Sequence, residues 1–253
     1  MEKSLVQQQF GAHAATYVTS VTHAKGASLA RLVELTTPQP DWTVLDVATG
    51  AGHTAFAFAP LVRQVWATDV TREMLQVTAE QAAQRGLQNL VVEYAEAERL
   101  PYADASFDLV TCRIAPHHFE DIHAFVRSVA RVLKPGGLFA LVDNIVPDGA
   151  AGDYINAFEK FRDPSHGRCL SMEEWRTVIQ SHGLITVREE MLQKRVDLAA
   201  WAARHDSLMR RYLRALLSEA TGPAAVFLAP DFDGEAASFR LWEGLFVSRR
   251  GEA

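Results

Sequence analysis

The sequence has few cysteines, no long apolar run and no excess of positive charge. Its two cysteines, Cys112 and Cys169, are too far apart for a paired zinc motif and form no disulfide framework. No segment reaches the ~20 apolar residues of a helical membrane span, and the amino terminus lacks the apolar run of a signal peptide. These absences predict a cytoplasmic protein that is neither exported nor membrane-spanning.

The charge balance makes nucleic acid an unfavourable partner. The formal net charge is −6, whereas binding to a phosphate backbone requires clustered Lys and Arg. The 48% apolar and 22% charged residues match ordinary globular usage. With 253 residues, we expect one α/β domain that contains an insertion.

Short apolar runs alternate with stretches of helical periodicity through the first 145 residues. This alternation predicts repeated βα units that form a parallel sheet. We expect strands at 43–47, 64–69, 90–94, 107–112 and 137–143. We expect helices at 54–61, 72–85 and 123–133, and the sequence Lys134-Pro135-Gly136-Gly137 ends the last of them.

The remaining segments are less regular. Helical patterns cover 153–161, 171–181 and 197–217, and a single strand is expected at 185–196. The run 238–248 is interpreted as an edge or hairpin strand. The first 40 residues are expected to be helical, with Phe10, Tyr17 and the stripe 29–35 facing inward.

The most informative segment is VLDVATGAGHTAFAFA, in which a strand passes through Asp46 into Gly50-Ala51-Gly52 and then into a helix. Glycines at such a turn adopt unusual backbone angles and let a ligand approach the main chain. Asp69 ends the next strand, seventeen positions beyond Gly52. A carboxylate there accepts hydrogen bonds from both hydroxyls of a ribose, so the segment predicts a nucleotide-like cofactor.

The turn also matches the loose dinucleotide pattern G-x-G-x-x-[GA], which keeps NAD as an alternative. However, Asp46 precedes the glycines, where it would repel a pyrophosphate and attract the ammonium group of a methionine moiety. Glu96-Ala97-Glu98 follows the third strand and provides an acceptor for an adenine amino group. The late hairpin-type strand stands in place of a second nucleotide-binding half. These features favour a methionine-containing cofactor.

The segments DVATGAGHT, ATDVT, AEAERLPYADASFDLVTCRIAPHHF and VARVLKPGGLFALVDN resemble successive motifs of the class I S-adenosylmethionine-dependent methyltransferases. They are most similar to the small-molecule branch that includes the ubiquinone and menaquinone C-methyltransferases. The resemblance covers residues 40–145 and extends more weakly to both ends. The chain departs from the family pattern at His53, where a third glycine is usual, and at Ala95-Glu96, where Gly-Asp is usual.

The resemblance implies a Rossmann-like α/β fold whose seven-stranded sheet is mostly parallel, with helices on both faces and a helical lid. It also implies three parts of the chain: an amino-terminal helical cap (1–40), a core that binds S-adenosylmethionine (41–145), and the rest of the sheet with an acceptor-site lid (146–253). The oligomeric state stays open, with a homodimer as one alternative.

The resemblance further implies a set of cofactor-binding positions: Tyr17, Lys25, Asp46, Ala48, Gly50, Gly52, Asp69, Val70, Glu96, Ala97, Cys112 and Arg113. By this likeness Asp46 and the two glycines surround the methionine part, Asp69 binds the ribose, and Val70, Glu96 and Ala97 contact the adenine. Cys112 and Arg113 lie beside the sulfonium, and the two amino-terminal residues close the pocket.

His117 and His118 follow the fourth strand and are the candidate catalytic bases, because imidazole titrates near neutrality. Packing or helix capping is the alternative role for either. Their spacing with His123 fits no metal site, so no metal is expected. Cys112 has no evident activating partner and is better explained as a small buried residue.

The irregular region after residue 143 is expected to supply the acceptor pocket, with candidates Tyr154, Phe158, Phe161, His166, Arg168, Trp175, Trp201 and His205. The resulting hypothesis is methyl transfer to oxygen or carbon of a small aromatic or quinol-like acceptor. An NAD-linked oxidoreductase and a non-catalytic S-adenosylmethionine-binding protein are the alternatives, because the fold alone does not decide the function.

Overall fold

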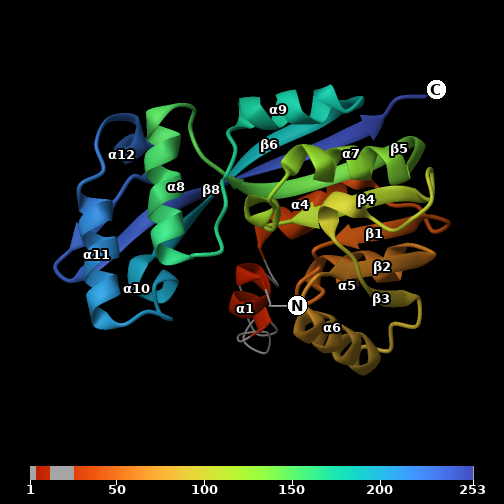
Figure 1. Ribbon diagram of the computed structural model, residues 1–253, viewed down its shortest axis with the longest axis horizontal. Coiled ribbons are helices and arrows are strands. Elements are labelled where there is room, and N and C mark those ends of the chain that lie inside the picture. Colours follow the sequence, from red (N-terminus) through yellow and green to blue (C-terminus); the bar gives the residue numbers. More distant parts are fainter. Residues whose placement is uncertain (1–3, 12–25, 253) are drawn as a thin grey trace.

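The computed structural model describes residues 4–11 and 26–252 and contains a central sheet with helices on both faces (Figure 1). The strands are β1 (Thr43–Val47), β2 (Gln64–Asp69), β3 (Leu90–Tyr94), β4 (Phe107–Arg113), β5 (Leu133–Ile145), β6 (Leu184–Asp197), β7 (Asp231–Asp233) and β8 (Ala236–Arg250). In the described ranges the sheet order is β3-β2-β1-β4-β5-β8-β6, and β7 pairs with β8 outside this order.

The sheet is parallel from β3 to β5 and becomes antiparallel at β8, which runs against both β5 and β6. Strands β1 and β4 are buried along nearly their whole length because helices cover both faces. This arrangement confirms the predicted Rossmann-like, mostly parallel sheet. The structure adds the short β7, which the sequence pattern did not reveal.

The helices outside the carboxyl-terminal region are α1 (Leu5–Gly11), α4 (Ala27–Thr36), α5 (His53–Phe58), α6 (Arg72–Gln84), α7 (Ile122–Val132) and α9 (Met172–Ser181). On one face of the sheet, Val129 of α7 and Trp175 of α9 pack into the same core. On the other face, Leu32 of α4 and Phe58 of α5 do so. The predicted inward stripe on 29–35 is confirmed, because Leu29 and Leu32 are buried.

Local chemistry explains where α7 begins and ends. The Asp121 side chain accepts a hydrogen bond of 2.8 Å from the Ala124 backbone N–H and so caps the first turn. Apolar side chains then recur at helical spacing and include Phe125, Val129 and Val132, all completely buried. The segment from Lys134 onward joins β5, so the predicted end of this helix is confirmed within one residue.

Helices α8 (Ala150–Arg162), α10 (Leu198–Trp201), α11 (Ser207–Ser218) and α12 (Gly222–Leu228) form a helical lobe at one end of the molecule (Figure 1). Its core combines Phe158, Leu213 and Leu228 with Phe239 of β8. The prediction of one helix over 197–217 was wrong. Asp206 interrupts it, because its side chain accepts a hydrogen bond from the Met209 N–H and starts α11 as a new helix.

Strand β8 is not an edge strand, but it forms a hairpin with β7, so the hairpin alternative predicted for 238–248 is confirmed and the edge alternative is wrong. It pairs with β5 from Leu138 to Ile145 and with β6 along nearly its full length. The edge position belongs to β6, whose side chains are largely half-buried or exposed. Partners on both sides explain why the middle of β8, including Leu245 and Phe246, is fully buried.

No helix in the described ranges is both long and apolar enough to cross a membrane. Tyr17 and Lys25, which the sequence analysis placed at the cofactor pocket, lie outside the residues that the structure describes.

Candidate active site

A cavity of about 2350 Å³ follows the carboxyl ends of β1 to β5 and extends to α8, β6 and α10. The strand order reverses between β1 and β4, and open α/β sheets bind ligands in the crevice at such a point. A separate groove of about 470 Å³ lies at the edge of β6 beside Arg176 and contains none of the described candidate residues. The large cavity is therefore the candidate active site.

The turn between β1 and α5 forms one wall of this cavity through Ala48, Thr49, Gly50 and Ala51. Ala48, Gly50 and Gly52 all have positive φ angles, of 53°, 54° and 84°. A Cβ atom on Gly52 would lie 2.4 Å from the Phe56 ring. Both this close approach and the positive φ angle favour glycine at this position. Gly52 does not line the cavity, and its contribution is to the shape of the turn.

Asp46 lies at the cavity beneath this turn and is 1% exposed. Thr49 Oγ1 donates a 2.6 Å hydrogen bond to one carboxylate oxygen, and Thr111 Oγ1 donates a 2.7 Å bond to the other. Burial raises the pKa of Asp46 to about 6, although both bonds and the charge of Arg113 oppose this shift. A cationic ligand group would stabilise the ionised form of this carboxyl.

Asp69 ends β2 at the cavity, where its carboxylate joins two neighbouring segments. Oδ2 accepts a 3.0 Å hydrogen bond from the Gly50 N–H, and Oδ1 accepts a 2.8 Å bond from the Thr71 N–H. Burial raises the pKa of this carboxyl. The Thr71 side chain and the Val70 backbone also bond this carboxyl, so Asp69 orients the glycine turn while lining the cavity.

Val70, Glu96 and Ala97 line the same end of the cavity. Val70 is held from the amino-terminal side, because Gln7 of α1 donates a 2.9 Å hydrogen bond to its carbonyl oxygen. Ala97 is buried at the start of the short helix η2 (Ala97–Arg99), whereas the Glu96 side chain is exposed. These positions combine an apolar contact surface with an exposed carboxylate at its edge.

Arg113 and Cys112 end β4 but differ in their surroundings. Arg113 lines the cavity and donates a 3.1 Å hydrogen bond from Nε to Thr54 Oγ1. Successive residues of a strand point to opposite faces, so Cys112 instead shares the buried core with Val110. Burial also raises the pKa of the Cys112 thiol well above its ordinary value. Cys112 therefore lies behind the cavity wall and is not a reactive thiolate.

His117 and His118 lie in the short helix η3 (Pro116–His118) and both line the cavity, with ring centroids 4.2 Å apart. His117 Nδ1 lies 2.6 Å from Asp143 Oδ1, and His118 Nδ1 lies 3.0 Å from the Ser165 carbonyl oxygen. Burial lowers the pKa of each imidazole to about 4. Both rings are therefore neutral at pH 7.

The tautomer of His118 follows from its partner. A carbonyl oxygen can only accept a hydrogen bond, so Nδ1 of His118 carries the proton and Nε2 keeps a lone pair. The partner of His117 is a carboxyl group, which does not fix the tautomer in this way. Burial raises the pKa of the Asp143 carboxyl well above its ordinary range. The Phe10 ring of α1 packs edge-on against His118 at 5.0 Å between centroids. An amino-terminal residue thus helps to fix the orientation of this imidazole.

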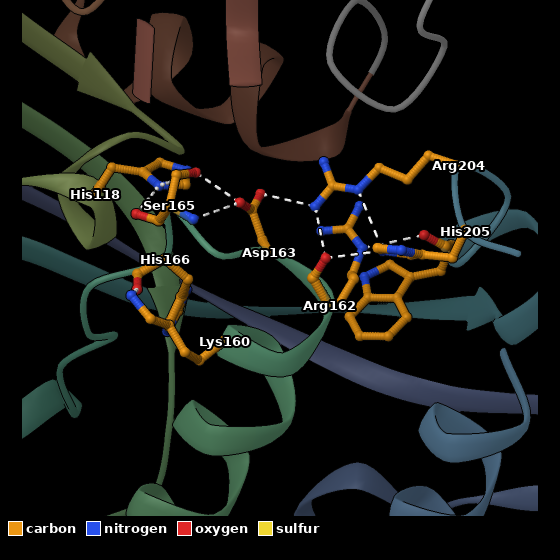
Figure 2. Close-up of polar contacts among 9 residues, drawn as sticks. His118, Lys160, Arg162, Asp163, Ser165, His166, Arg204 and His205 are labelled. Atoms are coloured by element: carbon orange, nitrogen blue, oxygen red, sulfur yellow. Dashed lines mark hydrogen bonds and ion pairs between the residues drawn. The ribbon is translucent and has the colours of Figure 1, made fainter. Parts of the chain in front are cut away.

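Figure 2 shows how the far end of the cavity is linked to the helical lobe. Asp163 accepts hydrogen bonds from the Ser165 backbone and hydroxyl groups, and its Oδ2 lies 3.0 Å from the Arg204 guanidinium. These bonds hold the pKa of Asp163 far below its ordinary range. Ser165 in turn presents its carbonyl to His118, so the orientation of the histidine depends on the lobe.

Comparison with known proteins identifies the family. The family profile described as "Methyltransferase domain" matches residues 45–141. The uncharacterized methyltransferase YcgJ of Bacillus subtilis is 39% identical over 176 residues, which cover 69% of this chain and 70% of that protein. The YcgJ crystal structure superimposes with a TM-score of 0.84 at 32% identity and covers 89% of this chain and 99% of that one. The chain belongs to the class I S-adenosylmethionine-dependent methyltransferases.

Two curated relatives have named activities. The 27-O-demethylrifamycin SV methyltransferase of Amycolatopsis mediterranei is 34% identical over 151 residues, covering 56% of this chain and 53% of that one. The UbiE ubiquinone/menaquinone C-methyltransferase of Brucella anthropi is 40% identical over 109 residues, covering 42% of this chain and 41% of that one. These matches confirm the family that the sequence motifs indicate.

Several predicted acceptor residues of this methyltransferase do not reach its cavity. His166, Arg168 and Trp201 line it. Five other candidates do not line it: Tyr154, Phe158, Phe161, Trp175 and His205. Tyr154 and Phe158 belong to the core of the lobe, Trp175 is buried in the core beneath the sheet, and Phe161 is exposed. Trp201 itself stacks on Phe158 and is contacted by the Arg162 guanidinium 4.6 Å from its ring centre.

Sequence reasoning missed several polar residues of the methyltransferase cavity, namely Asn144, Glu159, Lys160, Arg162, Asp163 and Lys194, together with Asp143 behind His117. The pair Asp143-Asn144 at the carboxyl end of an apolar strand was the one local signal that could have revealed two of them. Among the described residues, no group of three or more His, Cys, Asp or Glu side chains is arranged to hold a metal ion.

Proposed function

We propose that this methyltransferase transfers a methyl group to oxygen or carbon of a small, hydroxylated aromatic or quinol-like metabolite. The observation that carries the proposal is a single cavity that joins the glycine turn and Asp69 to His117, His118 and the lobe. The named relatives act on a rifamycin and on ubiquinone or menaquinone precursors, which supports a small-molecule acceptor.

We assign the cofactor to the end of the cavity formed by β1 and β2. Asp46 suits the ammonium group of the methionine moiety, because it is a buried carboxyl beside the turn. Asp69 suits the ribose hydroxyls, since it is a carboxylate that lines the cavity at the end of β2. Val70 and Ala97 provide apolar contacts for the adenine, and the exposed Glu96 can turn toward its amino group.

S-adenosylmethionine supplies the methyl group as an electrophilic sulfonium. The protein must align the acceptor atom with that group and exclude water, which accounts for much of the rate in such a displacement. The helical lobe is suited to both tasks as a lid, because Lys160, Arg162 and Trp201 border the cavity opposite the strand ends.

We further propose that one of the two cavity histidines removes a proton from the acceptor. His118 is the better-defined candidate, because its bond to the Ser165 carbonyl leaves the Nε2 lone pair available. Among the described residues, no side chain or backbone group bonds Nε2 of either histidine. Each imidazole is neutral at pH 7 and can therefore accept a proton.

The proposal is tested by incubating the full chain with S-adenosylmethionine labelled in its methyl group and a set of phenols, catechols and hydroquinones. We expect label in at least one phenolic product and none in transfer RNA or a protein extract tested in parallel. Label in RNA or protein alone would overturn the small-molecule assignment. Binding of the donor with no transfer to any of these compounds would favour the non-catalytic alternative.

A further inference from the structure

The lobe end of the cavity contains a carboxyl group with one buried oxygen that has no hydrogen-bond donor. Glu159 lies on α8, lines the cavity and is 5% exposed. No group in the described ranges donates a hydrogen bond to its buried Oε1 atom. A buried polar group without a partner costs free energy, so its presence in a cavity wall calls for a functional explanation.

Two of the three cationic side chains near Glu159 form ion pairs with other carboxylates. Arg162, Lys194 and Arg204 are its attractive charged neighbours, and Asp163 is a repulsive one. Lys194 bonds Glu243 at 2.5 Å, and Arg204 bonds Asp163. These two ion pairs cancel, so Arg162 provides the remaining positive charge near Glu159, and the carboxyl lacks a hydrogen-bond donor rather than a cation.

A second side chain in the same cavity has the same deficiency. Asn144 lines the cavity at the end of β5, and its Oδ1 atom is buried with no hydrogen-bond donor among the described residues. Both unpartnered atoms are acceptor oxygens. A ligand that satisfies them must bring hydrogen-bond donors, and a hydroxyl group supplies one without the charge of an ammonium group, which the nearby Arg162 would repel.

We propose that Glu159 is a specificity residue that accepts a hydrogen bond from a hydroxyl group of the methyl acceptor. The inference rests on the proposed function, because it assigns a substrate feature to the same cavity. It predicts selection of free hydroxyl compounds over their O-alkylated counterparts at the lobe end of the cavity.

The test uses resorcinol and 1,3-dimethoxybenzene, which differ only in whether the hydroxyls carry methyl groups. Dissociation constants are measured by NMR titration of the full chain with saturating S-adenosylhomocysteine. Wild type should bind resorcinol at least ~10-fold more tightly, because burial raises the pKa of Glu159, a donor hydroxyl favours its ionised form, and a hydrogen bond to a charged group contributes about this much or more. Glu159→Leu should reduce the preference to less than about twofold, and Glu159→Gln, which keeps an acceptor oxygen, should retain most of it.

The controls distinguish failure of the role proposed for Glu159 from failure of the proposed methyltransferase function. Glu219→Leu, an exposed change on the lobe away from the cavity, should keep the full preference. All variants should bind S-adenosylhomocysteine equally, and failure of wild type to bind it would contradict the proposed function itself. Equal preferences in wild type and Glu159→Leu, or no binding of resorcinol to wild type, would overturn the role of Glu159.

Discussion

Replacing His118 by glutamine is expected to lower the turnover number of methyl transfer by ~10²–10⁴, with little change in cofactor affinity. The loss follows because glutamine cannot accept the proton that the Nε2 lone pair takes up in the transition state. His117→Gln tests the neighbouring candidate in the same assay. If only one histidine is the base, only one variant should show the large loss.

The pH dependence of turnover distinguishes base catalysis from positioning. An imidazole acts as a base only while neutral, so the rate should fall as the pH falls through the pKa of the group. Burial lowers that pKa to about 4 in both histidines, which places the acidic limb well below the ordinary imidazole range. This limb should be present in wild type and absent from the variant that has lost the base.

His123→Gln is the matched control, because His123 lies on α7 outside the cavity and pairs with His182. It should leave turnover and the acidic limb unchanged. If His117→Gln and His118→Gln both keep the limb and lose less than about threefold in rate, neither histidine is the base. The acceptor is then already nucleophilic when it binds.

Asp69→Ala is expected to weaken binding of S-adenosylhomocysteine by about tenfold or more. By the proposed cofactor assignment the variant loses two charge-assisted hydrogen bonds to the ribose, each worth ~1.5–3 kcal/mol. The structure predicts a lower Tm for this variant as well. Asp69 also accepts bonds from the Gly50 and Thr71 N–H groups, which the variant leaves without that partner.

A control must therefore separate lost stability from lost binding. Asn89→Ala serves this purpose, because Asn89 bonds the Ala59 and Val62 carbonyl oxygens away from the cavity. It should lower the Tm and leave the dissociation constant unchanged, as measured by differential scanning and titration calorimetry. A folded Asp69→Ala protein with the wild-type dissociation constant would remove Asp69 from the cofactor site.

The first five strands were predictable because each is encoded locally. A short apolar run buried on both faces, followed by a turn and a helix with a cap such as Asp121, needs no information from distant residues. The glycine turn was equally legible, since positive φ angles restrict the choice of residue. The positions of Asp46 and Asp69 at the cavity follow directly from these elements.

The rest of the fold and of the candidate site depends on pairings between segments that are distant in the sequence. The place of β8 between β5 and β6 is set by two long registers that no local pattern contains. The same holds for the partnership of His117 with Asp143 and for the approach of Glu159 to the cavity from the lobe. The aromatic side chains of the lobe misled the sequence analysis, because an apolar residue has the same pattern in a core as in a pocket.

The most direct test of the cofactor assignment is titration calorimetry of the wild-type chain with S-adenosylmethionine, S-adenosylhomocysteine and NAD under identical conditions. We expect both sulfur compounds to bind with one site per chain and NAD not to bind. The buried carboxyl of Asp46 beside the glycine turn suits an ammonium group and opposes a pyrophosphate. Binding of NAD without a response to either sulfur compound would contradict the assignment of this cavity to S-adenosylmethionine.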